Sequence, residues 1–490
     1  MTIWLGLSLL MTGCATSVPS IAPKAEAAAA TPVQPETNHA DTNDHTVSLK
    51  PHGNLGLTPP TDIWERIRRG FAMPDLDDDF VRNREQWYAS RPDYILRMTE
   101  RSRPYLFHIV EELERRNMPT ELALLPFIES AFNPNAVSSA KAAGMWQFMP
   151  ATGKYFDLKQ NLFRDERRDV LESTRAALDY LQKLYSMFGD WHLALAAYNW
   201  GEGSVSRALA RNKAQGKPLT YSDLNMPNET RYYVPKLQAV KNIVAQPAMF
   251  NTQLPLIQNH PFFKSVSIDR DIDVAVAARL AGISPEDFKA LNPSMNRPVI
   301  LAAGTPQILL PWDNATTFEI NLQNQINQRL ATWTAWQAPR TMKPEEVANL
   351  VNMTAHQLRS ANGIPPNMMV KAGSTLLVHR QGELDNDVTE FVADNAQLAL
   401  APDIVLKRIM VKARRGDTLA SLAARHGVSE ANMMTWNKLK PHASLSTGQS
   451  LAILVPFQSA RMGTKTTLAH KKPQAPAHAV RRSTTQMAKR

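Results

Sequence analysis

The chain has 490 residues, of which 43% are hydrophobic and 20% are charged, as is typical of globular rather than fibrous or disordered proteins. Its length predicts several domains, on a prior of about 150 residues per domain. The net charge of +10 would suit a polyanionic partner, but eight basic residues and no acidic one lie between Ser459 and Arg490. The sequence therefore predicts a nearly neutral body with a basic tail, and no nucleic-acid partner.

The N-terminus carries an apolar stretch that ends at Cys14, the only cysteine. A single cysteine excludes disulfides within the chain and Cys-based zinc sites. The stretch IWLGLSLLMTGC is too short to span a bilayer and is typical of a signal peptide, although no Lys or Arg precedes it. Its last four residues resemble a bacterial lipobox, which implies a lipidated Cys14 and an outer-membrane lipoprotein facing the periplasm. An ordinary signal peptide is the alternative.

Residues 15–60 are rich in Ala, Pro, Thr and Asn, and they predict a tether without a core. Beyond Thr61, apolar residues recur at helical spacing, and no sustained alternation of apolar and polar residues occurs before residue 248. This pattern indicates an all-α domain over residues 61–248. Pro126 lies inside one helical segment and predicts a kink or short break there. We expect helices over residues 62–71, 103–117, 119–130, 169–188, 190–200, 203–212 and 230–245.

Three segments of thirteen residues resemble one another beyond residue 250: LAGISPEDFKALN (280–292), LVNMTAHQLRSAN (350–362) and RHGVSEANMMTWN (425–437). Each has Ser or Thr at its fifth position and ends in Asn. The fifth residue is expected to cap a short amphipathic helix. Another helical segment precedes each copy, and a small-residue turn and an apolar strand follow it. The repeating unit is therefore predicted to be strand–helix–helix–strand.

The third copy, with RRGDTL at 414–419, resembles a LysM module. In this turn Asp417 or Thr418 is expected to cap the next helix. The LysM family binds polymers that contain N-acetylglucosamine, such as peptidoglycan and chitin. The middle copy has Met-Lys-Pro-Glu at 342–345 in place of Gly-Asp-Thr, and the first copy lacks this turn. For these two degenerate copies, packing without sugar binding is the alternative.

One acid, Glu129, is set into the apolar run LLPFIESAF. Its apolar neighbours, and its expected place near a helix C-terminus, both favour the protonated carboxyl and raise its pKa. A protonated carboxyl can donate a proton at neutral pH. A surface residue at a helix end is the alternative for an isolated Glu.

Glu129-Ser130 is followed in order by AAGMWQFMP (142–150), AAYNWGEG (196–203) and NETRYYVP (228–235). This ordered set resembles the family of soluble-type lytic transglycosylases, which have a lysozyme-like fold related to goose-type lysozyme. The resemblance, together with the repeats, implies a mainly α fold. It consists of a lysozyme-like, goose-type all-α catalytic domain followed by small βααβ modules of the LysM type.

The resemblance implies that Glu129 is the only catalytic acid and base. Trp146 stands where many family members have Met, so the local packing is expected to differ. Ser138 matches a serine that forms a hydrogen bond near the acid, and Tyr198 and Asn199 match a pair that faces it. The full set of implied substrate-binding residues is Ser138, Gln147, Met149, Tyr198, Asn199, Glu229 and Tyr233.

The implied reaction cleaves the β-1,4 bond between N-acetylmuramic acid and N-acetylglucosamine without water. The N-acetyl group of the sugar stabilises the anomeric centre, and its C6 hydroxyl attacks C1 to give a 1,6-anhydromuramoyl end. No metal or cofactor is implied. Most glycosidases use a second carboxylate. None stands out in the matched blocks, although Asp157, Asp165 and Asp169 could reach the site through the fold.

Two alternatives remain open: a hydrolytic lysozyme on the same fold, and a catalytically inactive structural protein that binds peptidoglycan. The expected partners are peptidoglycan glycan strands and, through lipidated Cys14, outer-membrane lipid; the chain is expected to be a monomer. The predicted organisation is a signal peptide (1–14), a tether (15–60), a helical domain (61–248, core about 104–248), a degenerate LysM-like module (265–312), a connector (313–338), a degenerate LysM module (339–380), a linker (381–403), a LysM module (404–456) and a basic tail (457–490).

Overall fold

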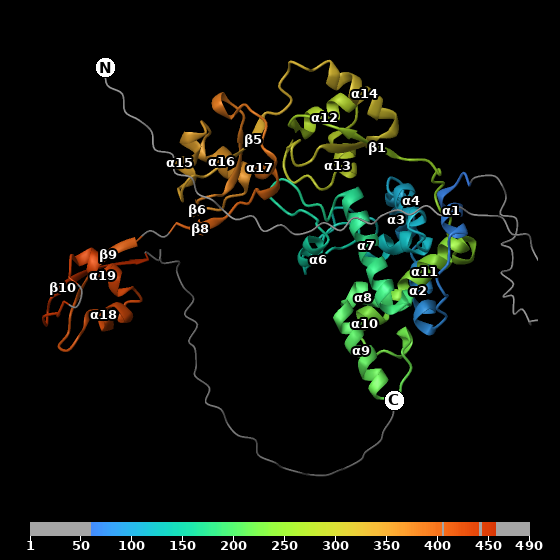
Figure 1. Ribbon diagram of the computed structural model, residues 1–490, viewed down its shortest axis with the longest axis horizontal. Helices are drawn as coiled ribbons and strands as arrows, with labels where there is room; N and C mark the ends of the chain where they lie inside the picture. Colours follow the sequence, from blue (N-terminus) through green and yellow to red (C-terminus); the bar gives the residue numbers. More distant parts are fainter. Residues whose placement is uncertain (1–59, 404–405, 441–442, 457–490) are drawn as a thin grey trace, which may run out of the picture. The chain divides into compact units, whose positions relative to one another are not determined.

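The computed structural model describes residues 60–456, apart from 404–405 and 441–442. The predictions for the signal peptide, for Cys14, for nearly all of the tether and for the basic tail fall outside the described residues. No helix in the part that the structure describes is long and apolar enough to cross a membrane. Figure 1 labels the elements in chain order.

The first half of the described chain is helical, and the predicted fold class is confirmed (Figure 1). Its only pairing of extended backbone is in isolated bridges, such as Val137 with Ala143 and Ala143 with Phe148. The helices are α1 (Ile63–Arg69), α2 (Asp79–Ala89), α3 (Pro92–Ser102), α4 (Leu106–Arg115), η1 (Thr120–Leu124), α5 (Leu125–Glu129), α6 (Pro150–Tyr155), α7 (Val170–Phe188), α8 (Trp191–Trp200), α9 (Glu202–Ala214), η2 (Tyr221–Asp223), α10 (Asn228–Arg231), α11 (Tyr233–Ala245) and η3 (Pro247–Phe250).

The helix expected over residues 119–130 is divided in two, as Pro126 predicted. Residues Thr120–Leu124 form the 3₁₀ helix η1, and α5 begins at Leu125 with Pro126 in its first turn. Proline has no N–H to donate to the preceding turn, so one continuous α-helix is unfavourable here. Glu129 is the last residue of α5. The break therefore places the acid at a helix C-terminus.

Sequence analysis did not predict α2 and α3. Helix α2 buries only Val81 and Tyr88 along its length, so its apolar periodicity is weak. It forms because Asp78 caps it, accepting a hydrogen bond from the amide of Val81 at 2.8 Å, and because it packs against α11. Tertiary packing stabilises this helix where local pattern gives little signal.

The helices enclose one hydrophobic core, in which Trp64, Phe127, Phe132 and Trp146 are fully buried. The chain beyond α11 returns to this core. The indole of Trp64 donates to the carbonyl of Pro255 at 2.8 Å. The helical domain therefore includes residues beyond 248, because they complete the packing around α1.

The strand–helix–helix–strand units are present in all three repeats. Each pairs its first strand antiparallel to its last: β1 with β4, β5 with β7, and β9 with β10. The first unit contains β1 (Phe263–Ser267), β2 (Ile272–Asp273), α12 (Val274–Ala281), α13 (Pro285–Leu291), β3 (Val299–Ile300) and β4 (Gln307–Pro311); the second contains β5 (Trp333–Gln337), α15 (Pro344–Leu350), α16 (Ala355–Asn362), β6 (Met368–Val370) and β7 (Thr375–His379); the third contains β9 (Leu406–Lys412), α18 (Leu419–Arg425), α19 (Glu430–Asn437) and β10 (Ser450–Pro456).

The segments assigned to a connector (313–338) and a linker (381–403) contain regular structure. The connector interval holds most of α14 (Trp312–Gln323) and all of β5, the first strand of the second unit. The linker interval holds η4 (Gly382–Leu384), α17 (Glu390–Asn395) and β8 (Leu400–Pro402), which pairs with β6. Strands β5 and β8 form by pairing with strands distant in the chain, and a local sequence pattern does not reveal such pairing.

The repeated Ser or Thr caps the second helix of every unit, as predicted: Ser284, Thr354 and Ser429 each accept a hydrogen bond from the backbone amide three residues later. The repeated Asn has a role that sequence analysis did not assign. Asn437 donates to the carbonyl of Ala452 at 2.8 Å and accepts from its amide at 2.7 Å. Asn292 and Asn362 bond Leu309 and Leu377 in the same way.

A buried ion pair joins the first unit to the second. Arg380, directly after β7, bonds Asp271 before β2 at 2.6 Å, and the Asp271 side chain is fully buried. Asp273, at the end of β2, accepts from both the amide and the hydroxyl of Thr332 at 2.9 and 2.6 Å. These bonds pair buried charges that would be costly alone, although Oδ1 of Asp273 has no partner among the described residues.

Candidate active site

Glu129 lies half-buried at the end of α5, where Phe127 and Phe132 form part of the core behind it. Its carboxylate Oε1 accepts a hydrogen bond from the hydroxyl of Tyr233, the first residue of α11. Tyr233 is itself buried. Local structure thus places the acid at a helix end, and a residue far along the chain holds its side chain.

The pKa of Glu129 is raised from 4.5 to about 7, mainly because burial disfavours the carboxylate. The hydrogen bond from Tyr233 and the positive charge of Lys236 act in the opposite direction, and the negative charge of Glu229 raises the pKa further. At neutral pH the group is therefore about equally populated as acid and carboxylate. A group in this state can donate a proton and later accept one.

Hydrogen bonds join the four sequence blocks into a closed set. Ser130 donates to the carbonyl of Met145 at 2.9 Å, and so links the first block to the second. The other bonds run from Tyr198 to the carbonyl of Trp146 (2.9 Å), from Thr230 to Oδ1 of Asn199 (2.8 Å), and from Tyr233 to Glu129. The blocks that the sequence motifs distinguished therefore form one site.

The predicted site residues differ in how directly they meet the acid. Tyr198 is partly buried, and the negative charge of Glu129 adds to the effect of burial in raising the pKa of the Tyr198 hydroxyl well above 10. Glu229 is exposed and acts on Glu129 through its charge. Ser138 accepts from the amide of Ala142 at 3.0 Å, and no hydrogen bond joins it to Glu129 among the described residues.

Gln147 and Met149 lie on the loop after Gly144. The side chain of Gln147 donates to the carbonyl of Gly144 at 2.7 Å and to that of Ala136 at 3.3 Å. Met149 is 43% exposed, so its side chain offers apolar surface to the solvent. Gly144 has φ +86°, which favours glycine in the backbone turn at this position.

Trp146 fits the site without disturbing it. Its side chain is fully buried, and its indole donates to the hydroxyl of Thr174 at 3.1 Å. The side chain that departs from the family's Met therefore packs in the core behind the loop. Sequence reasoning missed Lys236, although this residue lies one helical turn beyond Tyr233 on α11. It included Ser130 in the first block without assigning its bond to Met145.

Of the three other candidate carboxylates, Asp157 is exposed, and the remaining two are engaged elsewhere. Asp165 forms two bonds with Arg167, at 2.9 and 2.7 Å. Asp169 caps α7 and accepts from Ser294 at 3.0 Å. Among the described residues, Glu229 is the carboxylate whose negative charge raises the pKa of Glu129. No group of three or more His, Cys, Asp or Glu in that chain could hold a metal ion.

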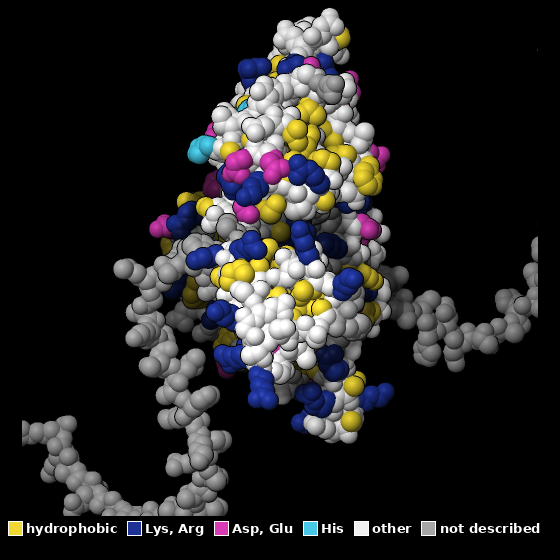
Figure 2. Space-filling view, turned by 90° about the vertical axis from the view of Figure 1, so that its left-hand side faces the viewer, with side chains coloured by type: hydrophobic (Ala, Val, Ile, Leu, Met, Phe, Trp, Pro, Cys, Tyr) yellow, Lys and Arg dark blue, Asp and Glu magenta, His cyan; other side chains and the backbone are white. Residues whose placement is uncertain are grey.

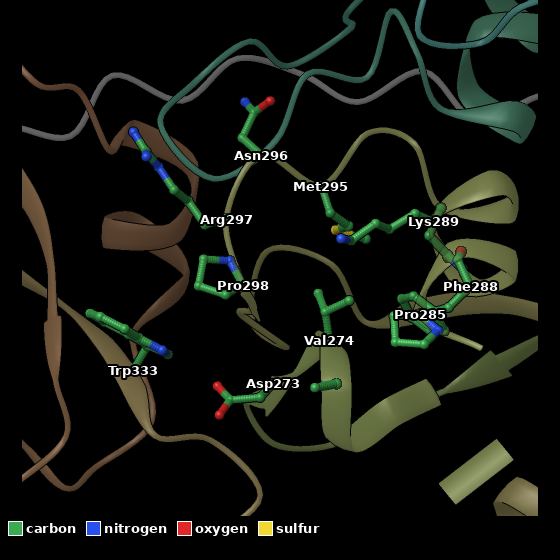
Figure 3. A pocket seen from close by; sticks show the side chains of 12 residues that line it. Asp273, Val274, Pro285, Phe288, Lys289, Met295, Asn296, Arg297, Pro298 and Trp333 are labelled. Carbon is green, nitrogen blue, oxygen red and sulfur yellow. The ribbon is translucent and has the colours of Figure 1, made fainter. Parts of the chain in front are cut away.

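A separate cavity of about 490 Å³ lies beside the first repeat (Figure 3). Trp333 of β5 lines it, stacked on His379 with ring centroids 4.0 Å apart, and Asp273 faces the same space. Within the described part of the chain, Oδ1 of Asp273 is buried and has no hydrogen-bond partner. An unpaired buried carboxylate oxygen beside an aromatic ring suits a ligand that donates hydrogen bonds.

Basic side chains on the face shown in Figure 2 are scattered among uncharged and apolar ones and form no continuous patch there. Basic side chains distributed in this way do not form the continuous positive surface that a polyanion would bind.

Sequence comparison identifies the class of protein. Residues 108–220 match the family described as "Transglycosylase SLT domain", 262–326 match "Lytic transglycosylase MltD, LysM-like domain", and 345–379 and 411–453 match "LysM domain". The first match covers Glu129 and α5 to α9, and the others cover parts of the three repeat units. The fold and the site therefore define a lytic transglycosylase domain followed by LysM-type modules.

Comparison with individual relatives identifies the family within this class. Membrane-bound lytic murein transglycosylase D of Escherichia coli is 33% identical over 408 residues, covering 81% of this chain and 87% of the relative. Soluble lytic murein transglycosylase of Escherichia coli is 30% identical over 127 residues, covering 25% and 19%. The solved structure of an inactive mutant of lytic transglycosylase Slt from Pseudomonas aeruginosa matches 30% of this chain and 25% of its own, at 24% identity and a TM-score of 0.24. The chain belongs to the membrane-bound lytic murein transglycosylase D family.

Proposed function

We propose that this peptidoglycan lytic transglycosylase uses Glu129 as its single catalytic acid and base. The observation that carries the proposal is the pKa of Glu129, raised to about 7 by burial while Tyr233 holds the side chain in place. A general acid works best when its pKa lies near the working pH. The other nearby carboxylates are paired or exposed, so a second catalytic carboxylate is not required by this arrangement.

In the proposed reaction, protonated Glu129 gives its proton to the glycosidic oxygen between N-acetylmuramic acid and N-acetylglucosamine. The bond from C1 to that oxygen breaks, and the N-acetyl group of the muramoyl residue stabilises C1. The carboxylate of Glu129 then takes the proton of the C6 hydroxyl as its oxygen attacks C1. The products are a free N-acetylglucosamine end and a 1,6-anhydromuramoyl end. Glu129 regains its proton, and no water or metal is consumed.

The remaining site residues are proposed to bind the glycan strand. Gln147 and Met149 present polar and apolar surface on one loop, and Asn199 and Glu229 lie on α8 and α10. Ser138 and Tyr198 shape the same site through hydrogen bonds to backbone groups. Glu229 also supplies a negative charge that keeps Glu129 protonated.

The test compares the wild type with Glu129→Gln on purified peptidoglycan sacculi, with mass spectrometry of the soluble products. The wild type should release muropeptides lighter by one water than hydrolysis products, and Glu129→Gln should release none. Reducing ends alone would establish the hydrolytic lysozyme instead. Equal clearing by both proteins would support the non-catalytic binding protein.

We also propose that the cavity beside the first repeat binds the N-acetylglucosamine of the glycan. Trp333 offers an aromatic face for a sugar ring, and Asp273 offers an acceptor for its hydroxyl or amide groups. Trp333→Ala, made in the Glu129→Gln background, should weaken calorimetric binding of a soluble N-acetylglucosamine oligomer. Trp312→Ala, which removes an exposed tryptophan outside this cavity, is the matched control. Equal affinity of both variants would contradict this binding position.

Lipidation of Cys14 is proposed as the anchor to the outer membrane, with the enzyme facing the periplasm as a monomer. The motif Met-Thr-Gly-Cys at 11–14 supports this proposal. Mass spectrometry of the mature protein should find an acylated N-terminal Cys14, and light scattering in detergent should give the mass of one chain. An unmodified mature N-terminus elsewhere would refute the anchor.

A further inference from the structure

The loop that carries Gln147 and Met149, here called the site loop (residues 141–149), is held in an unusual conformation. Its ends are joined by backbone hydrogen bonds of 3.0 Å in both directions between Ala143 and Phe148. Gln147 has φ +52°, in the left-handed region that is unfavourable for a residue with a side chain. Such a conformation persists only where the surroundings fix it.

Arg167 supplies that fixation from outside the loop. Its guanidinium donates to the carbonyl of Lys141 at 2.8 Å and to the carbonyl of Phe148 at 3.2 Å, and so spans the two ends of the site loop. The same guanidinium bonds both carboxylate oxygens of Asp165. Only 11% of the Arg167 side chain is exposed. A planar fork of this kind fixes geometry more strictly than a single point charge.

The backbone of Arg167 also touches the site loop. A Cβ atom added to Gly144 would lie 1.9 Å from the carbonyl oxygen of Arg167. The loop and Arg167 are therefore in contact through both main chain and side chain, with no room for an intervening group. A shift of Arg167 must move the loop that presents Gln147.

The first repeat anchors the segment that contains Arg167, here called the brace segment (residues 159–169). The amide of Asp165 donates to the carbonyl of Ser294 at 2.9 Å, and the amide of Asn296 donates to the carbonyl of Phe163 at 2.8 Å. Phe163 is buried in a small apolar cluster with residues of both degenerate repeats. Arg164 adds a bond to the carbonyl of Gly304 in the first repeat, and another to Asp394 of α17 at 2.7 Å.

We propose that Arg167 is a positioning residue that sets the site loop for glycan binding, and that the two degenerate repeats act on the site by anchoring the brace segment. This assignment rests on the proposed function of the site loop. It gives the degenerate repeats a role in substrate binding by the catalytic domain, separate from any sugar that they bind themselves. Arg167 forms no hydrogen bond with Glu129 or Tyr233, so its main effect is expected on glycan binding by the site loop.

The test measures initial rates on soluble glycan strands for full-length Arg167→Gln and Arg167→Lys. Arg167→Gln should raise KM about tenfold, since two bonds to the loop are lost, while kcat and the pH profile stay unchanged. Arg167→Lys keeps the charge and one bond and should lie between this variant and the wild type. The matched control is Arg175→Gln, which removes bonds to Glu172, Asp179 and the carbonyl of Phe156 but none to the site loop.

A melting temperature lowered in Arg167→Gln, with KM unchanged for its folded fraction, would show a purely structural role and overturn the proposal. Arg164→Gln tests the anchor, because it loosens the brace segment without touching the site loop; KM should rise by a smaller factor. An unchanged KM in Arg164→Gln would overturn the part assigned to the repeats. If Glu129→Gln retains activity, the proposed function itself fails, whatever the Arg167 variants do.

Discussion

Tyr233→Phe should raise the pKa of Glu129 above its value of about 7. The hydroxyl of Tyr233 bonds the Glu129 carboxylate, and this bond lowers the pKa against the effect of burial. A hydrogen bond to a charged group contributes roughly 1.5–3 kcal/mol, and one pKa unit corresponds to about 1.4 kcal/mol. Removal of the bond should therefore raise the pKa by roughly one to two units.

The assay is the pH dependence of kcat/KM on soluble glycan strands, because this ratio reports the ionisation of the free enzyme. Activity needs protonated Glu129, so the wild-type rate should fall as pH rises through about 7. In Tyr233→Phe the fall should begin roughly one to two pH units higher. Tyr198→Phe is the control, since that hydroxyl bonds the carbonyl of Trp146 and not the acid. A fall at the same pH in all three proteins, or at a lower pH in Tyr233→Phe, would refute the reasoning.

Three further predictions concern stability. Glu129→Gln should be more stable than the wild type at pH 8 but not at pH 4. As pH rises from 4.5 to about 7, the carboxyl ionises in the unfolded wild type before it does in the folded one, so the wild-type free energy of unfolding falls by about 3 kcal/mol. Denaturant titrations of both proteins at several pH values measure this difference. Asn437→Ala should lower the local stability of the third unit by about 2–3 kcal/mol and speed hydrogen exchange of the Ala452 amide. Unchanged exchange would contradict the role assigned to the Asn437 side chain. Asp271→Ala removes the buried partner of Arg380, which keeps only the more exposed Asp387, and should destabilise the paired repeats by about 1.5–3 kcal/mol; an unchanged melting temperature would show the pair to be dispensable.

Periodicity and capping in the sequence were sufficient to predict most helices of the catalytic domain and the repeat unit. The break at Pro126 and the caps at Ser284, Thr354 and Ser429 follow from local chemistry, and the structure confirms them. Helix α2 and strand β5 were missed because packing partners far along the chain stabilise them.

In the candidate active site, too, local sequence predicted some features and contacts between distant residues set the others. The sequence motifs singled out Glu129, and burial explains its raised pKa in the direction expected. The contact that orients it comes from Tyr233, 104 residues later, and no local pattern reports such a pairing. Arg167 was not noticed at all, because it lies outside the matched blocks and acts on the site loop through backbone carbonyls.

The most direct measurement of the central claim is a carbon-13 NMR titration of the Glu129 carboxyl in the full-length protein, assigned by the signal missing from Glu129→Gln. We expect a titration midpoint near pH 7, at which the Glu129 carboxyl can both release and regain a proton at neutral pH. A midpoint near 4.5, the ordinary value for a hydrated glutamate, would contradict it.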